Sequence, residues 1–223
     1  MRMKLLCNAL VKVTLGIALV GAMVFLPAGT LAYQQGWLFM GLLFVPMVIA
    51  GFVMLFKAPE LLAKRLDAKE KQGDQKMVVA VSGLMFIAGF VVAGLDHRFG
   101  WSQVPLAVTV VASVLFLIAY GLYAEVLREN AYLSRTVKVE EGQTVVSTGL
   151  YGIVRHPMYA ATILLFLMMP LVLGSWYGAI IFLVYPVLII IRLKGEEALL
   201  IKELPGYAEY REKVKYRIIP FVW

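Results

Sequence analysis

Six long apolar blocks dominate this chain and limit what it can fold into. They lie at residues 13–32, 37–56, 77–95, 104–124, 158–173 and 176–191. The first four have 19 to 21 residues each, close to the roughly 20 that a helix needs to cross about 30 Å of hydrocarbon. Since a bilayer offers no water to backbone polar groups, runs of this length predict helices. We therefore expect an all-α, polytopic integral membrane protein with about six transmembrane helices.

The composition excludes several other classes of protein. Of the 223 residues, 61% are hydrophobic and only 16% are charged, whereas soluble domains carry about 25% charged residues. The net charge of +7 does not indicate nucleic acid as a partner, because the basic residues lie between apolar blocks and are not interleaved with aromatic ones. Cys7 alone cannot form an intramolecular disulfide, and two histidines, His97 and His156, are too few for a His-rich metal site. We therefore expect no metal.

The basic residues predict how the chain lies in the membrane. All but one of the 21 lysines and arginines lie in four segments: the N-terminus, 57–76, 125–155, and the tail from Arg192. The exception is Arg98. The positive-inside rule places both termini and these segments in the cytoplasm, and we expect the membrane to be a prokaryotic inner (plasma) membrane. The first block is longer than the roughly 7–15 apolar residues of a signal peptide, so we interpret it as a retained helix.

Two parts of the chain are expected. Residues 1–76 would supply two transmembrane helices and a cytoplasmic loop, and residues 77–223 would form the functional core. In that core the last two blocks have about 16 residues each, are joined by Gly174-Ser175, and are interrupted by Pro170 and Pro186. The alternation of Val around Glu141-Gly142 in 136–146 predicts a small hairpin or extended loop. The tail, 193–214, has helical apolar spacing broken at Pro205-Gly206 and predicts a cytoplasmic cap.

The residues that could take part in binding or catalysis flank the last two blocks. Arg155-His156-Pro157-Met158-Tyr159 comes before the fifth block, and Arg192, Glu196 and Glu197 follow the sixth. Each residue has an ordinary explanation as a helix-end charge, a first-turn proline or an interfacial aromatic. Folding the two blocks into a hairpin brings both groups to one membrane face, and Arg192 and Glu196 share a helical face at i, i+4. Charged groups at such positions are costly without partners or a task, so together they predict a site.

These motifs resemble those of a known family. The ordered set consists of Gly149-Leu150-Tyr151-Gly152-Ile153-Val154-Arg155-His156-Pro157-Met158-Tyr159, then Arg192-x-x-x-Glu196-Glu197, then Gly206-Tyr207-x-x-Tyr210 and Pro220. It is similar to the isoprenylcysteine carboxyl methyltransferase family, and related membrane phospholipid methyltransferases share much of the pattern. The similarity covers roughly residues 125–223.

The resemblance implies S-adenosyl-L-methionine as cofactor, bound on the cytoplasmic side. By that resemblance the cofactor contacts are Gln143, Thr144, Val145, Val146, Tyr151, His156, Pro157, Met158, Tyr159 and Glu196. Arg192 would bind the methyl acceptor, and Arg128 and Asn130 would lie on the acceptor side. Glu197 would serve as a base if the acceptor were an amine.

The acceptor itself stays open between two chemistries. A carboxylate, with a reference pKa near 4, is already a nucleophile at neutral pH and needs placement only. A phospholipid amine would have to lose a proton. We expect a lipophilic small molecule or lipid as partner, membrane lipids around the chain and no nucleic acid; the sequence does not predict an oligomeric state. Transport is disfavoured because the blocks lack ionisable residues away from their ends, and an inactive scaffold is the remaining alternative.

Overall fold

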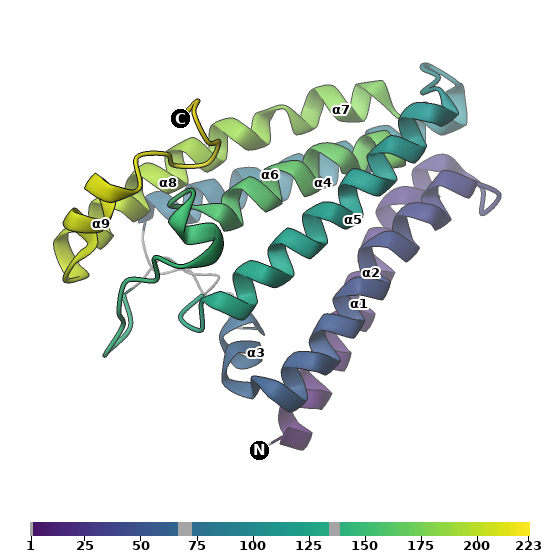
Figure 1. Ribbon diagram of the computed structural model, residues 1–223. Coiled ribbons are helices and arrows are strands. Elements are labelled where there is room, and N and C mark those ends of the chain that lie inside the picture. The colour runs from purple at the N-terminus through teal and green to yellow at the C-terminus, as the bar shows by residue number, and fades with distance from the viewer. Residues whose placement is uncertain (1, 67–72, 134–138) are drawn as a thin grey trace.

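Helices account for nearly all regular structure in the part of the chain that the structure, a computed structural model, describes: residues 2–66, 73–133 and 139–223. In these ranges the helices follow one another as α1 (Arg2–Ala28), α2 (Gln34–Lys57), α3 (Pro59–Leu66), α4 (Gly73–Phe99), α5 (Leu106–Glu129), the 3₁₀ turn η1 (Gly149–Gly152), α6 (Pro157–Val172), α7 (Trp176–Phe182), α8 (Val184–Glu203) and α9 (Tyr207–Lys213). Figure 1 shows their arrangement. The predicted all-α class is confirmed for these residues.

Five segments in the described ranges are long and apolar enough to cross a membrane. They comprise α1, α2, α4 and α5, together with the stretch Trp176–Glu203 formed by α7 and α8. The sixth predicted span corresponds to α6, which has 16 residues and is therefore about 24 Å long, shorter than a typical hydrocarbon core. Five of the six predicted spans are therefore long enough to cross a membrane, and the sixth, α6, is shorter.

The break in the last hairpin lies before Pro186 rather than at it. The helix is interrupted at Leu183, between α7 and α8, and Pro186 lies in the first turn of α8. A proline ring clashes with the carbonyl group four residues earlier, here Phe182, and that is the residue at which α7 ends. In the tail, the predicted break at Pro205-Gly206 is found between α8 and α9. Of the predicted hairpin, residues 136–138 lie outside the described residues, and 139–146 form a turn without a strand.

The helices pack through aromatic side chains and small residues. Phe39, Phe116 and Phe182 are fully buried between α2, α4, α5 and α7. Gly94 on α4 lets α1 approach so closely that an added Cβ would lie 2.5 Å from the Val24 carbonyl oxygen. Close approach at small residues is the usual way in which helices associate in lipid, where both partners are surrounded by apolar tails.

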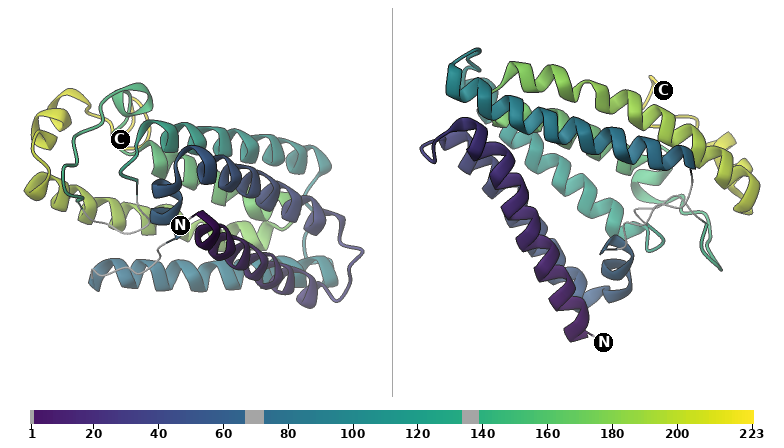
Figure 2. Two further views of the ribbon diagram at one scale, coloured as in Figure 1. Left: turned by 90° about the horizontal axis from the view of Figure 1, so that it is seen from below. Right: turned by 180° about the vertical axis from the view of Figure 1, so that it is seen from behind.

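The bundle has two different ends. Three short turns, at residues 29–33, 100–105 and 173–175, lie at one end, which we call the turn end. The opposite end, with α3, η1 and α9, is the loop end. Seen from behind, α1 and α2 diverge from the other helices towards the loop end (Figure 2, right). The functional residues predicted from the sequence all belong to the loop end.

Candidate functional site

The C-terminal tail fastens the start of α6 to the loop end. The backbone N–H of Arg155 donates to the Tyr216 carbonyl at 2.9 Å, and that of His156 donates to the Arg217 carbonyl at 2.8 Å. The tail turns back on itself through bonds from Arg217 and its neighbours to the carbonyl of Trp223. Residues far apart in sequence therefore form one cap over the membrane helices.

A buried ion network lies beneath this cap. Glu197, 4% exposed, accepts from Arg155 Nε at 2.8 Å on one carboxylate oxygen and from Arg217 Nε at 2.9 Å on the other. His156 Nε2 lies 3.3 Å from the first oxygen. The Arg155 guanidinium also donates to the carbonyls of Val214 and Lys215 at 2.7 and 2.8 Å. We call Glu197, Arg155, His156 and Arg217 the Glu197 network; it ties α6, α8 and the tail together.

A second polar group lies one turn further along α6, on the neighbouring face of α8. The Tyr159 hydroxyl donates to Glu196 Oε2, and Arg192 Nε donates to the Tyr159 hydroxyl at 3.1 Å. Because Arg192 and Glu196 are four residues apart on α8, both reach the same side chain of α6. The predicted pairing of a cation and an anion on one helical face is present in this geometry.

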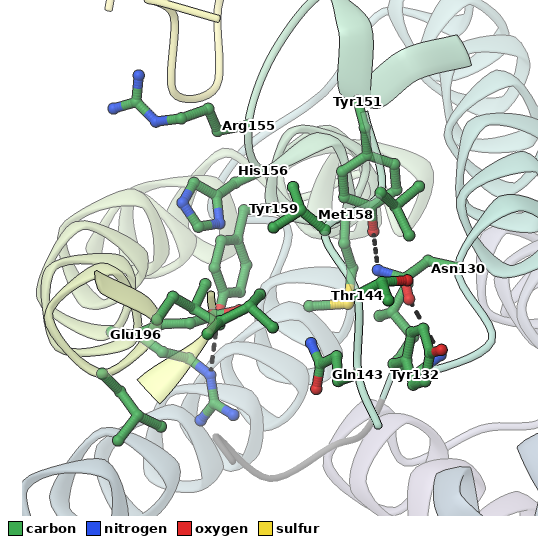
Figure 3. A pocket seen from close by; sticks show the side chains of 17 residues that line it. Asn130, Tyr132, Gln143, Thr144, Tyr151, Arg155, His156, Met158, Tyr159 and Glu196 are labelled. Carbon is green, nitrogen blue, oxygen red and sulfur yellow. Dashed lines mark hydrogen bonds between the residues drawn. The ribbon is translucent and has the colours of Figure 1, made fainter. Parts of the chain in front are cut away.

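These groups border a pocket at the loop end (Figure 3). Its walls come from the end of α5 and the residues after it, the loop before η1, the start of α6, and α8. The lining residues are Asn130, Tyr132, Leu133, Gln143, Thr144, Val145, Val146, Tyr151, Arg155, His156, Met158, Tyr159, Arg192, Glu196, Leu199, Leu200 and Leu204. Side chains of tyrosine, histidine, amide and carboxylate type thus face one cavity together with aliphatic ones.

Hydrogen bonds hold the aromatic wall of this pocket in place. Asn130 Nδ2 donates to the Tyr151 hydroxyl at 3.0 Å, and Asn130 Oδ1 accepts from the Tyr132 backbone N–H at 3.0 Å. From α9, the Tyr210 hydroxyl donates to the Tyr151 carbonyl at 2.7 Å. Burial raises the pKa of the Tyr151 and Tyr210 hydroxyls well above the ordinary tyrosine value, so both remain protonated at neutral pH.

The pocket has a volume of about 110 Å³. Small-molecule sites usually span about 300–1,000 Å³, so a ligand of nucleoside size requires the wall to move. Gln143–Val146 lie in a loop, as do Tyr132 and Leu133 after α5, whereas Met158, Tyr159, Arg192 and Glu196 are held on α6 and α8. This loop is held by local contacts, such as the Glu140 N–H donating to Gln143 Oε1 at 2.9 Å.

The structure brings all but three of the sequence-predicted site residues to this pocket. Asn130, Gln143, Thr144, Val145, Val146, Tyr151, His156, Met158, Tyr159, Arg192 and Glu196 line it. Pro157 is buried at the first position of α6, next to the lining residues, and orients the helix rather than facing the cavity.

Arg128 and Glu197 are the other two predicted residues that do not line the pocket. Arg128 is exposed and pairs with Glu125 on its own helix, with Nε and Nη2 donating at 2.8 and 2.6 Å. Glu197 follows Glu196 by about 100° around α8 and therefore faces the tail. There it already accepts from two guanidinium groups, which makes it a poor position for a base acting in the pocket.

Several lining residues were not predicted: Tyr132, Leu133, Arg155, Leu199, Leu200 and Leu204. Leu199 and Leu200 follow Arg192 and Glu196 on α8 at helical spacing, a periodicity that could have found them. Arg155 stands within the leading motif, where the sequence also allowed a plain helix-end cation. In Figure 3 it lies at the edge of the group, its guanidinium pointing away from the other labelled side chains. Tyr132 and Leu133 carry no sequence signal of their own.

A search of curated proteins found no match to this chain. A sequence model of the isoprenylcysteine carboxyl methyltransferase (ICMT) family does match, over residues 107–202. The matched region runs from α5 to the end of α8, so it contains the pocket residues on those helices. It begins earlier and ends sooner than the range of roughly 125–223 expected from the motifs. It leaves out α1 to α4 and the tail that carries Arg217. The resemblance is confirmed for this region: α5 to α8 are similar to the ICMT family.

Proposed function

We propose that this chain is an integral membrane methyltransferase that uses S-adenosyl-L-methionine to methylate the carboxylate of a lipophilic acceptor, such as an isoprenylcysteine-like compound. The observation that carries this proposal is the Tyr159–Glu196–Arg192 group. It stands at the membrane-side wall of a polar pocket, within the region that matches the ICMT family. There a polar cofactor and an apolar acceptor can approach the same atoms from opposite sides.

The donor and acceptor groups of the pocket fit S-adenosyl-L-methionine. Its adenine and ribose need aromatic and aliphatic surface with a few hydrogen-bonding groups, which Tyr151, Met158 and Gln143 offer. Its ammonium and sulfonium are cationic, and Glu196 is the carboxylate that lines the cavity among the described residues. The cofactor would thus be held by Glu196, His156 and the loop residues 143–146.

The protein has little chemistry to perform beyond placement. When bound, S-adenosyl-L-methionine supplies a methyl group that a carboxylate oxygen accepts as the sulfur–carbon bond breaks, with the electron pair remaining on sulfur. No proton moves in that reaction, so no general base is required. Arg192 would hold the acceptor carboxylate, because a guanidinium forms paired bonds with both of its oxygens. Tyr159 keeps Arg192 and Glu196 at a fixed separation.

The two candidate bases support a carboxylate acceptor over an amine. Glu196 accepts from the Tyr159 hydroxyl, and Glu197 is buried in its network outside the pocket lining. An amine acceptor would need one of them to take up a proton at the reacting atom. We further infer from the lysine and arginine distribution that the pocket faces the cytoplasm, where the cofactor is dissolved.

Titration calorimetry of purified full-length protein with S-adenosyl-L-methionine tests the proposal. We expect binding in the unaltered protein, and its loss in Glu196→Ala. The control is Glu203→Ala, which removes an exposed carboxylate from the same helix. Absence of binding in the unaltered protein would refute the proposed function.

A transfer assay with a labelled methyl group identifies the acceptor chemistry. Vesicles containing N-acetyl-S-farnesylcysteine should yield a base-labile ester. A base-stable product from phosphatidylethanolamine vesicles would instead show N-methylation and overturn the carboxylate assignment.

A further inference from the structure

The C-terminal tail closes into a hook over residues 216–223. The Trp223 carbonyl accepts from the backbone N–H groups of three consecutive residues that begin with Arg217, at 2.8, 3.0 and 3.2 Å. The Ile219 carbonyl in turn accepts from the N–H groups of Val222 and Trp223 at 3.2 and 3.1 Å. These bonds fix the backbone of the segment, which we call the tail hook, in one shape.

The turn at the tip of the hook carries an aromatic residue at a position that favours glycine. Pro220 and Phe221 occupy its two central positions, and Phe221 has φ +64°. A positive φ at the second central position is typical of a type II turn, where glycine is usual because it has no Cβ. The centre of the Phe221 ring lies 5.2 Å from that of Tyr216, yet Phe221 is 87% exposed. Packing within the chain therefore offsets little of the backbone strain, and a strained residue of this kind is a reason to seek a task for its side chain.

The hook buries some of its apolar side chains and exposes the others. Ile218 is buried in the main apolar core, against which Trp223 also packs. By contrast, Ile219 is 53% exposed and Val222 is 74% exposed. Single exposed apolar residues need no explanation, but here three lie within four residues and form a small apolar surface. We call Ile219, Phe221 and Val222 the hook tip.

The hook lies at the level where the apolar part of α6 begins. Its Tyr216 and Arg217 carbonyls accept from the N–H groups of Arg155 and His156. The apolar block of α6 starts two residues after His156, at Met158, and two residues span about 3 Å along a helix axis. The tail runs back from α9 towards the turn end, and so towards the membrane-spanning part of the bundle (Figure 1, Figure 2). The hook therefore stands at the boundary of the apolar segment.

The surroundings of the hook tip match the interfacial layer of a bilayer. An aromatic ring with aliphatic neighbours suits the boundary between headgroups and acyl chains. Lys215 is exposed just before the hook, where its stem can lie on apolar surface while its ammonium group reaches lipid phosphates. The membrane helices expose apolar side chains of their own to lipid, so the hook tip continues an apolar surface that is already in contact with the bilayer.

We propose that the hook tip inserts into the interfacial layer of the surrounding membrane and docks the C-terminal cap on it. This inference goes beyond methyl transfer and requires only that the chain spans a membrane. The hook supplies the carbonyls that hold the start of α6 and the Arg217 side chain that binds Glu197. Contact between lipid and the hook tip would therefore stabilise the cap in addition to its internal bonds.

Electron paramagnetic resonance on a spin label tests the position of the hook tip. The full-length protein with Cys7→Ser, which removes the single native cysteine, and Val222→Cys is spin-labelled and reconstituted in phosphatidylcholine vesicles. Molecular oxygen collects in the bilayer, whereas a charged nickel chelate stays in water. We expect the Val222→Cys label to collide more with oxygen than with the nickel chelate. The control is Glu209→Cys in the same background, an exposed position on α9, where the order should be reversed.

Two substitutions at Phe221 separate the role of its ring from that of the turn. Phe221→Gly removes the ring and suits the positive φ, so the turn itself should form at least as readily. Phe221→Leu keeps an apolar side chain. With the label on Val222→Cys, we expect Phe221→Gly to lose most of the preference for oxygen and Phe221→Leu to keep most of it. Far-UV circular dichroism checks that both variants retain their helices.

A preference for oxygen that depends on the Phe221 ring supports insertion of the hook tip. A Val222→Cys label that collides with the nickel chelate as readily as the Glu209→Cys label would place the hook tip in water and overturn the proposal. Weak collision with both reagents would show burial against protein, such as a second copy of this chain, and would equally overturn it. An unchanged oxygen preference in Phe221→Gly would refute insertion through Phe221. None of these results depends on binding of S-adenosyl-L-methionine, so the proposed function stands or fails separately.

Discussion

Two buried carboxylates stand at opposite ends of the bundle and are stabilised in different ways. At the turn end, Asp96 is 1% exposed and accepts from neutral donors: the Ser102 N–H and hydroxyl at 2.7 and 2.6 Å, and the Ser175 hydroxyl at 2.5 Å. At the loop end, Glu197 accepts from the guanidinium groups of Arg155 and Arg217. Both ends are thus closed by a carboxylate, but only one of them uses opposite charges.

The difference follows from what each end has to do. The Asp96 contacts join short turns that connect helices already packed together, and hydroxyl groups suffice there. The Glu197 network holds together a tail and a helix start that are far apart in the sequence, and charge-assisted bonds are about twice as strong as neutral ones. It also leaves the adjacent pocket with fixed walls. We infer that the turn end contributes to stability alone, whereas the loop end contributes to stability and to binding.

The largest effect is expected from Glu197→Ala. It leaves Arg155 and Arg217 without their carboxylate partner, and breaking a buried pair on one side costs about 3–5 kcal/mol. The unfolding midpoint in detergent should fall strongly, and calorimetry should show that S-adenosyl-L-methionine binding is lost with the cap. Glu203→Ala on the same helix serves as the exposed control. An unchanged midpoint would show that the cap does not depend on this network.

Asp96→Ala should have a smaller effect, on stability alone. It leaves the Ser102 N–H and the Ser175 hydroxyl without their acceptor, which costs about 1–3 kcal/mol when such groups are buried. The unfolding midpoint should drop while the affinity for S-adenosyl-L-methionine, measured below that midpoint, stays the same. Weakened cofactor binding would contradict the separation of the two ends.

Tyr210→Phe should lower the affinity for the cofactor more than it lowers stability, the opposite of Asp96→Ala. It removes one bond, to the Tyr151 carbonyl, worth about 0.5–1.5 kcal/mol, and Tyr151 lines the pocket. We expect a slight loss of stability and a measurable loss of cofactor affinity. The matched control is Tyr120→Phe, which removes a hydroxyl that donates to the Leu43 carbonyl at 2.7 Å away from the pocket. Equal affinities in the two variants would argue against a positioning role for Tyr210.

Arg128→Gln should have no measurable effect on the unfolding midpoint or on cofactor affinity. Its ion pair with Glu125 is exposed and screened by solvent. A strong loss of acceptor turnover in this variant would instead support the acceptor-side role suggested by the family resemblance, and would place the acceptor in the groove between α2, α3 and α5 that Arg128 borders.

Much of the fold could be predicted because membrane helices are encoded locally. The apolar blocks needed only length and composition to be identified. The helices observed there have other bounds: α1 begins eleven residues before its block, at Arg2, and α5 ends five residues after its block, at Glu129. The length of α6 and the break at Leu183 were harder to place. They depend on where a proline ring meets a carbonyl, not on the mean polarity of the segment.

The site residues also fall into two groups, those that sequence spacing identifies and those that only packing places. Tyr159, Arg192 and Glu196 could be identified from motif and spacing, since i, i+4 neighbours on a helix must share a face. Glu196 and Glu197 look equivalent in the sequence, yet one lines the pocket and the other is buried among arginines. Arg217 and Tyr132 carry no motif, and they reach their positions only because distant segments pack together.

By itself, the sequence determined the class of the protein, the positions of its apolar helices and the motif that marks the site, because hydrophobic length and helical period act over short stretches of chain. Only the tertiary structure decided which carboxylate faces the pocket and which cations neutralise the other. Those outcomes depend on contacts between α3, α6, α8 and the tail, and the geometry of such contacts is fixed by packing rather than by local spacing.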